Sequence, residues 1–155
     1  MGSEFRQQPS YQTLVAFFRL AGAMGKVADA YLRQFDLTQS QFNVLIVLAY
    51  ERPSGAKQTE LCEELLVKAA NMTALVRKLE GNGLIRRGPH ESDERAWWVT
   101  LTPAGRRLLK RVEPEYHRIV EELMAVHSGP ELRRFAAAID RTHRSLQRLV
   151  QGVGL

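Results

Sequence analysis

The sequence has few of the features that stabilise secreted proteins or anchor membrane proteins. Its 155 residues include one cysteine, Cys62, which excludes an internal disulfide framework and favours a reducing compartment. No apolar run approaches the roughly 20 residues that a membrane-spanning helix requires, and no basic-then-apolar leader opens the chain. We therefore expect a globular protein of one compact domain or two intimately shared ones, located in the cytoplasm and without contact to a membrane.

The residue patterns of catalysis and cofactor binding are also missing. The chain has no Gly-rich phosphate loop, no nucleophile elbow and no pair of acids placed for general acid–base work. Its four histidines show no close metal-ligand spacing, and the helical stripe of Glu113, His117 and Glu121 is better explained as solvated surface. We expect no enzyme activity, no cofactor and no metal ion.

The net charge of +5 is a weak indication of a nucleic-acid partner, because the excess charge lies near the C-terminus. Residues 56–102 carry seven basic and seven acidic side chains. Residues 103–155 carry ten basic and six acidic ones. The placement of individual side chains must therefore decide which surface binds a polyanion.

Hydrophobic periodicity predicts six helices and one hairpin. Thr38 and Gln41 form a capping-box pattern at the start of the second helix, and Thr102 followed by Pro103 is typical of a helix start. Turn residues separate two short alternating segments, which predict a β-hairpin with a polar tip. The predicted helices span residues 11–35, 38–50, 59–65, 69–80, 103–124 and 128–149, and the predicted strands span 84–87 and 97–101.

This order indicates a mainly α protein with a small β-hairpin wing, a winged helix-turn-helix between long N- and C-terminal helices. The long helices are too apolar to be covered by so small a centre, so we expect them to pack against a second copy of the chain. The expected divisions are a cloning-site remnant or disordered N-terminus at 1–8, a dimerisation helix at 9–36, a DNA-binding domain at 37–102 and C-terminal dimerisation helices at 103–155.

The polar face of the 69–80 helix suits the major groove of double-stranded DNA, which admits one helix with small and polar side chains. Asn71 is placed to read adenine, Thr73 a thymine methyl group or a phosphate, and Arg77 and Lys78 the backbone. Lys68 would suit a phosphate at the helix start. A surface helix without a ligand looks similar, so this face alone leaves both interpretations open. The residues expected to contact DNA here are Lys68, Ala70, Asn71, Thr73, Ala74, Arg77 and Lys78.

The hairpin adds a second candidate contact. Asp93 lies two residues before Arg95 and is close enough to brace it, so that Arg95 reaches the minor groove. Arg86, in the first predicted strand, is a further expected contact. An unremarkable solvated turn is the alternative.

The stretch from Asp93 to Gly105, DERAWWVTLTPAG, resembles the wing signature of the MarR family of transcriptional regulators. The segment from Leu79 to Arg87 also resembles that family's recognition-helix exit. The resemblance implies a homodimer whose recognition helices enter adjacent major grooves and whose wing arginines reach the minor groove of a pseudo-palindromic operator. Many such proteins are repressors released by small aromatic or phenolic ligands. Ala74, Arg77 and Lys68 depart from the family's usual residues, so its base preference does not transfer.

Three further interpretations concern how the chain is regulated or what it binds. One is a ligand cleft formed by aromatic and apolar side chains beside a cation, although an ordinary core explains such a stripe better. A redox sensor at Cys62 is another, against which we favour simple packing beside Leu61 and Leu65. A winged-helix module that binds proteins instead of DNA is the third. The expected ligand-contacting residues are Phe17, Arg19, Met24, Lys26 and Phe42.

Overall fold

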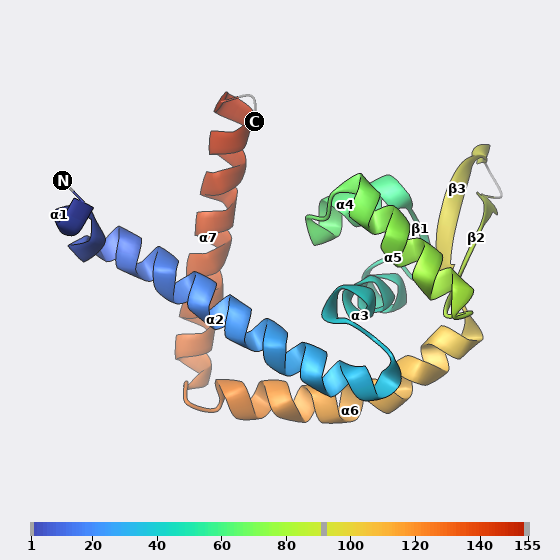
Figure 1. Cartoon of the computed structure of the whole chain (residues 1–155), viewed down its shortest axis with the longest axis horizontal. Coiled ribbons are helices and arrows are strands. Elements are labelled where there is room, and N and C mark those ends of the chain that lie inside the picture. Colours follow the sequence, from blue (N-terminus) through green and yellow to red (C-terminus); the bar gives the residue numbers. More distant parts are fainter. Residues whose placement is uncertain (1, 91–92, 154–155) are drawn as a thin grey trace. The chain divides into compact units, whose positions relative to one another are not determined.

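The computed structural model describes residues 2–90 and 93–153, and it forms two compact units, Met1–Glu113 and Pro114–Leu155. Residues 1–8, where we expect a cloning-site remnant or a disordered N-terminus, include the short helix α1 (Gly2–Gln7). The predicted order of long helices, helix-turn-helix and hairpin is confirmed (Figure 1). The other elements of the chain are α2 (Pro9–Leu32), η1 (Arg33–Phe35), α3 (Gln39–Ile46), η2 (Val47–Glu51), β1 (Ala56–Lys57), α4 (Gln58–Leu65), α5 (Ala69–Gly81), β2 (Ile85–His90), β3 (Asp93–Leu101), α6 (Pro103–Met124) and α7 (Gly129–Val153).

The first unit centres on three helices, α3, α4 and α5, and a three-stranded antiparallel sheet in the order β1-β3-β2. The sequence did not predict β1, which pairs Ala56 with Val99 of β3. Gly55 permits this pairing, since its φ is +101° and a Cβ there would lie 2.7 Å from a methyl carbon of Thr100. The hairpin strands also run further into the predicted turn than expected, because Pro89 lies in the edge strand β2, where proline is tolerated.

The core of this unit is formed by the apolar faces of the helices and the inner face of the sheet. Helix α5 contributes Met72, Val76 and Leu79, which have the spacing of one helical face, whereas α4 contributes Leu61. The fully buried large side chains are Phe42, Leu32, Leu45, Leu48, Leu61, Met72, Leu79, Ile85, Val44, Val76, Val99 and Val112.

The predicted helix caps are present. At the start of α3, the Thr38 N–H donates to Oε1 of Gln41 at 2.9 Å, and the Gln41 N–H donates to Oγ1 of Thr38 at 3.3 Å. At the start of α6, the Gly105 N–H donates to Oγ1 of Thr102 at 3.1 Å. The same Thr102 hydroxyl lies 2.7 Å from the carbonyl oxygen of Gly83, so this residue both caps α6 and holds the loop after α5.

Gly105 is buried where α6 passes the start of the wing. A Cβ at this position would collide with the carbonyl oxygen of Leu84 and lie 2.6 Å from Cδ1 of Leu101. The close approach of α6 to both segments therefore requires glycine.

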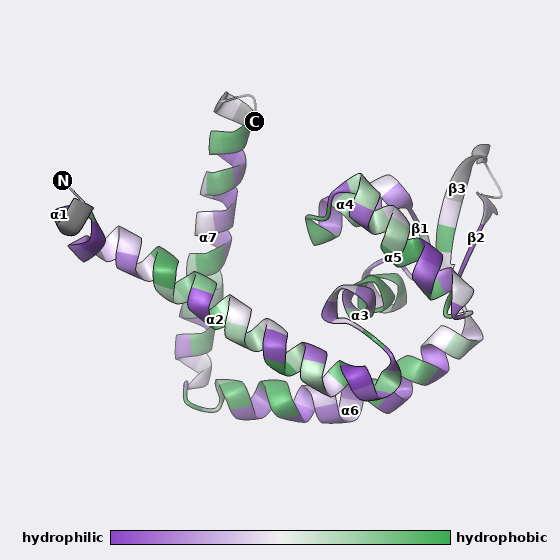
Figure 2. Ribbon diagram, viewed as in Figure 1, coloured by the Kyte–Doolittle hydropathy of each residue, from purple (hydrophilic) through white to green (hydrophobic). Residues whose placement is uncertain are grey.

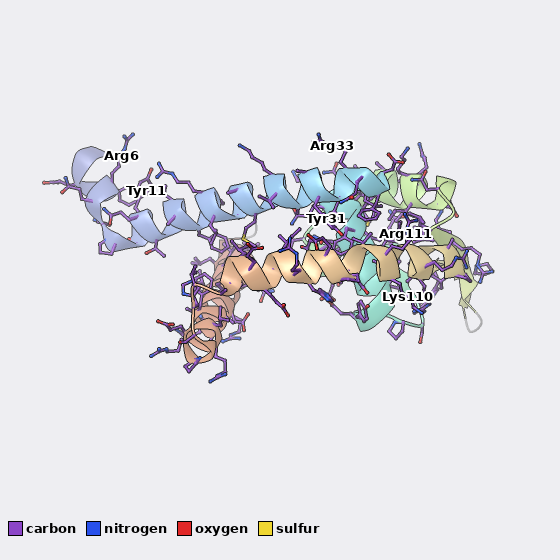
Figure 3. All side chains as sticks on the ribbon, turned by 90° about the horizontal axis from the view of Figure 1, so that it is seen from below. Arg6, Tyr11, Tyr31, Arg33, Lys110 and Arg111 are labelled. Atoms are coloured by element: carbon purple, nitrogen blue, oxygen red, sulfur yellow. The ribbon has the colours of Figure 1, made fainter. Side chains whose placement is uncertain are left out.

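Helix α2 and the short helix η1 that follows it contact the first half of α6 through an aromatic pair and a cation. The Tyr31 hydroxyl donates to the carbonyl oxygen of Val112 at 2.8 Å. The Phe35 ring lies 5.6 Å from that of Tyr31, and the Arg111 guanidinium carbon lies 5.8 Å from the centre of the Phe35 ring. Figure 3 shows Tyr31 and Arg111 directed into the region between the two helices. These contacts attach the long N-terminal helix to the first unit.

The second unit consists of the end of α6, from Pro114 onward, and α7. Helix α6 continues through Pro114. Hydrophobic and hydrophilic residues alternate around α7 (Figure 2). Its exposed apolar side chains, spaced to share one face, are Phe135, Ile139, Leu146, Leu149 and Val150. None of the helices in the described part of the chain is both long and apolar enough to cross a membrane.

Candidate nucleic-acid interface

Helix α5 has one buried and one exposed face, as the sequence predicts. Met72, Val76 and Leu79 are fully buried against the core. The opposite face, which we call the outer stripe, consists of the exposed residues Ala70, Asn71, Ala74, Arg77 and Lys78.

Small side chains occupy the middle of the outer stripe. Ala70 and Ala74 are one helical turn apart, with Asn71 and Lys78 on one side of them and Arg77 on the other. This arrangement lets the helix backbone approach a groove closely and places the longer basic side chains at its walls. It matches what a recognition helix needs in a major groove.

The start of α5 also has groups suited to an anion. Lys68 is the N-cap residue and is exposed, and its side chain makes no capping hydrogen bond. The first backbone N–H groups of a helix have no partner inside the helix and attract phosphate. Lys68 therefore adds a positive charge at an end that already favours negative charge.

Thr73 lies at the edge of the outer stripe and differs from the other predicted contacts. It is half-buried, and its hydroxyl donates to the carbonyl oxygen of Ala69 at 2.9 Å. Oγ1 of Thr73 also accepts a hydrogen bond from Nε2 of Gln58 at 2.7 Å. The Thr73 hydroxyl proton is thus used inside the protein. Sequence reasoning missed Gln58, because a contact between residues fifteen apart on two helices leaves no local pattern.

The turn between α4 and α5 is made without glycine. Leu66 ends α4 with a φ of +53°, in the left-handed region that bulky residues rarely adopt. Its amide N–H donates to the Glu63 carbonyl oxygen and that of Val67 to the Cys62 carbonyl oxygen, which closes the helix end. The side chain of Leu66 is 73% exposed, so this turn gains little from packing.

Glu80 joins the end of α5 to the wing. Nε of Arg87 lies 2.8 Å from Oε2 of Glu80, and the Arg87 backbone N–H donates to Oε1 at 3.1 Å. The hydrogen bond from the Arg87 side chain lowers the pKa of Glu80 below its ordinary value. Both oxygens of one carboxylate thus hold strand β2 against the last turn of the recognition helix.

The wing residues are placed only in part. Arg86 is exposed on β2, opposite Thr100 of β3. Asp93 and Arg95 belong to β3, but their side chains lie outside the described residues. The expected bracing of Arg95 by Asp93 stays a prediction.

The five residues expected to contact a ligand do not come together within one chain. Phe42 is 2% exposed in the core, on α3. The others lie on α2, where Phe17 and Met24 share one face, while Arg19 and Lys26 lie on the opposite face. Arg19 instead lines a shallow depression with Arg6 and Tyr11, which Figure 3 labels near the start of α2.

Cys62 lies on α4 next to the fully buried Leu61 and is itself half-buried. It is the single cysteine of the sequence. This position beside a buried leucine agrees with the packing that we expect of Cys62.

Comparison with known proteins agrees with this arrangement. The model that describes the MarR family matches residues 35–96, which include α3, α4, α5, strand β2 and the start of β3. The transcriptional regulator HosA of Escherichia coli O111:H- is 31% identical over 100 residues, which cover 64% of this chain and 73% of HosA. The chain belongs to the MarR family. Membership of the MarR family, rather than the lack of a visible active site, supports the expectation that the chain is not an enzyme.

Two other proteins extend the comparison beyond HosA. TtmR, an HTH-type transcriptional regulator of Methylorubrum extorquens (strain PA1), is 30% identical over 118 residues. The match covers 76% of this MarR-family chain but only 60% of TtmR. Among solved structures, the crystal structure of the S. aureus MepR–DNA complex is similar with a TM-score of 0.78 and 26% identity, over 93% of this chain and 99% of MepR. The MarR-family fold thus extends over nearly the whole chain.

Proposed function

We propose that this chain is a transcriptional regulator that binds double-stranded DNA in the cytoplasm as a homodimer and represses transcription. The observation that carries the proposal is the outer stripe of α5, with Ala70 and Ala74 in the middle and Asn71, Arg77 and Lys78 around them. Such a stripe is of little use for packing, and it offers a major groove small side chains for the bases and cations for the phosphates. The similar MepR has been crystallised with DNA.

The wing supplies the second part of the proposed interface. Arg86 is exposed on β2, and the Glu80–Arg87 contact fixes this strand to the recognition helix. We place Arg95 in the minor groove beside the major groove that α5 occupies, with Asp93 as its brace. A winged-helix module for protein binding would not need cations on both elements.

Exposed apolar side chains support the homodimer. On α2, Leu14 and Phe18 are 51% and 65% exposed, and on α7, Leu146 and Leu149 are 57% and 62% exposed. Exposed apolar side chains that share one face of a helix are unfavourable in water and mark an interface. A second copy presents the same faces, so a two-fold dimer covers both and brings two recognition helices to a pseudo-palindromic operator.

Release by a small aromatic ligand completes the proposal. Phe17 and Met24, which share a face of α2, are the two predicted contacts that can line one side of such a site. Arg19 and Lys26 would contact the same ligand only from another copy of the chain, because they lie on the opposite face of the helix.

Selection of DNA from a random-sequence library by the parent protein tests the proposal. A labelled duplex recovered in this way is titrated with the parent, with Arg77→Ala, with Lys78→Ala and with Arg95→Ala, at several salt concentrations. Loss of one phosphate contact made by a lysine or arginine reduces the steepness of the slope of log affinity against log salt by about 0.9. Lys110→Ala, which removes an exposed cation on α6, is the matched control.

The proposal fails if the parent recovers no duplex at low salt, or if all three variants keep the parent's affinity and salt slope. Repression is tested separately, with a reporter gene placed behind the selected duplex. Expression of the parent should lower reporter output, and an increase would show an activator.

A further inference from the structure

Gln58 and Thr73 form a hydrogen-bonded chain between the two helices of the helix-turn-helix. Gln58 is the first residue of α4, and its Nε2 donates to Oγ1 of Thr73 at 2.7 Å. Thr73 in turn donates its hydroxyl proton to the carbonyl oxygen of Ala69 at 2.9 Å. The direction of the chain is determined: since the hydroxyl proton goes to Ala69, the Thr73 oxygen can only accept from Gln58, and the glutamine must present its nitrogen.

The contact with Thr73 uses only part of the hydrogen-bonding capacity of Gln58. An amide nitrogen carries two hydrogens, of which Thr73 takes one. The second hydrogen and Oε1 are not part of the contact with Thr73, and Gln58 is only half-buried. The orientation of the amide is set by a partner on the other helix, so the second N–H is directed in a defined way at little further cost in side-chain entropy.

The position of Gln58 indicates what this N–H meets. Thr73 lies at the edge of the outer stripe that faces α4, and Gln58 reaches it from that side. In a helix-turn-helix, the second helix enters the major groove and the first helix crosses the sugar-phosphate backbone. A side chain at the start of the first helix, beside the edge of the stripe, therefore meets the wall of the groove.

From these contacts we infer that Gln58 donates its second amide hydrogen to a DNA phosphate, and that Thr73 is the positioning residue that aims it. This rests on the proposed function, since it assigns two further roles within the same interface. Thr73 does not contact DNA through its hydroxyl. Its side chain fixes the register of the first helix on the backbone relative to the recognition helix.

Two substitutions at Thr73 separate this role from a contact between its methyl group and thymine. Thr73→Val keeps the size and a methyl group but removes the hydroxyl, whereas Thr73→Ser keeps the hydroxyl and removes the methyl group. The inference expects Thr73→Val to weaken binding of the selected duplex about tenfold, the scale of one hydrogen bond. Thr73→Ser should remain within about twofold of the parent. The reverse order would overturn the inference and favour a methyl contact.

Gln58→Ala tests the other end of the chain. It should weaken binding about as much as Thr73→Val, and the double variant should be no weaker than either single one, because both remove the same contact. The loss should be equal for the selected duplex and for an unrelated duplex, since a phosphate contact carries no sequence information. The salt slope should stay that of the parent because an amide has no charge.

Several outcomes would contradict the inference. Parent-like affinity of Gln58→Ala does so directly, as does a loss confined to the selected duplex, which would make Gln58 a base reader. Gln34→Ala, an exposed glutamine in η1, is the matched control, and thermal melting shows whether each variant is folded. If the parent binds no duplex, the proposed function itself fails. If the parent binds and Gln58→Ala binds equally well, only the inference about Gln58 fails.

Discussion

Glu80, in the last turn of α5, binds Arg87 of strand β2 through both oxygens of its carboxylate. One oxygen accepts from the backbone of Arg87 and the other from its guanidinium. Because α5 and the wing touch DNA in different grooves in the proposed complex, this contact determines how the two are spaced.

Glu80→Gln should weaken this contact and lower the melting temperature at neutral pH. The folded pKa of Glu80 lies below the ordinary value of 4.5, so the contribution of the carboxylate is present above that value. It is lost as the pH falls through the lowered folded pKa. Thermal melts of parent and variant from neutral to acidic pH should therefore converge. Glu63→Gln, on the exposed side of α4, should track the parent throughout, and a constant gap for Glu80→Gln would contradict the role of ionisation.

Gly105→Ala should destabilise the protein by about 1–3 kcal/mol, the usual cost of overpacking. The new methyl group would collide with the Leu84 carbonyl oxygen, which belongs to the backbone and cannot rotate away. Urea unfolding gives the free energy directly. Gly81→Ala is the matched control, because no atom lies within 4 Å of a Cβ there, and it should be neutral or stabilising by up to about 1 kcal/mol. Equal effects of the two substitutions would count against a packing role for Gly105.

Phe42→Ala should lower the free energy of unfolding by about 3–5 kcal/mol, as expected for a fully buried aromatic side chain. Lys26, another residue that we expected to contact a ligand, is exposed. Lys26→Ala should therefore change the free energy of unfolding by about 0.5 kcal/mol or less. Urea unfolding at one protein concentration compares them. If Phe42→Ala were as stable as Lys26→Ala, the core position of Phe42 would be wrong.

Leu149→Glu should convert the proposed dimer to a monomer at micromolar concentration. The leucine is 62% exposed within the apolar stripe of α7, and a charge there must lose its hydration if the face is covered. Light scattering coupled to size-exclusion chromatography measures the mass. Gln147→Glu adds the same charge outside the stripe and should leave the mass of the parent. A parent that is already monomeric would refute the dimer.

Cys62→Ser should leave DNA binding and its response to peroxide unchanged. The half-buried thiol has no second cysteine in its own chain with which to form a disulfide. Titration of the selected duplex before and after peroxide treatment measures the effect. A parent that releases DNA after oxidation, together with a variant that does not, would instead establish Cys62 as a sensor.

Much of the fold was predictable because local signals agreed with it. The Thr38–Gln41 capping box and the cap by Thr102 appear in the structure as the sequence predicts. Elements with no local signal were missed. Strand β1 has two residues and forms because Gly55 allows a close approach to β3. Leu66 has a left-handed backbone conformation at the end of α4, a position where glycine is the usual residue.

The candidate site was predictable to a similar extent. Helical periodicity identified the outer stripe of α5, since burial of one face exposes the other. Side-chain partners across two helices were not predictable, and the contact of Thr73 with Gln58 changes what Thr73 can do. The expected ligand residues could not be sorted from the sequence for the same reason. Phe42 is apolar, which suits a ligand site or a core, and only the three-dimensional packing shows that α3 places it in the core.

Thr102 and Gly105 lie in the stretch that makes the chain recognisable by sequence, and both serve the closure of α6 against the loop after α5. Neither belongs to the outer stripe. These two residues are thus distinct from the residues of α5 that we propose to read the bases of an operator. If α5 selects the operator as proposed, the outer stripe can change while Thr102 and Gly105 keep α6 in place, so these two residues indicate the architecture and not the genes controlled.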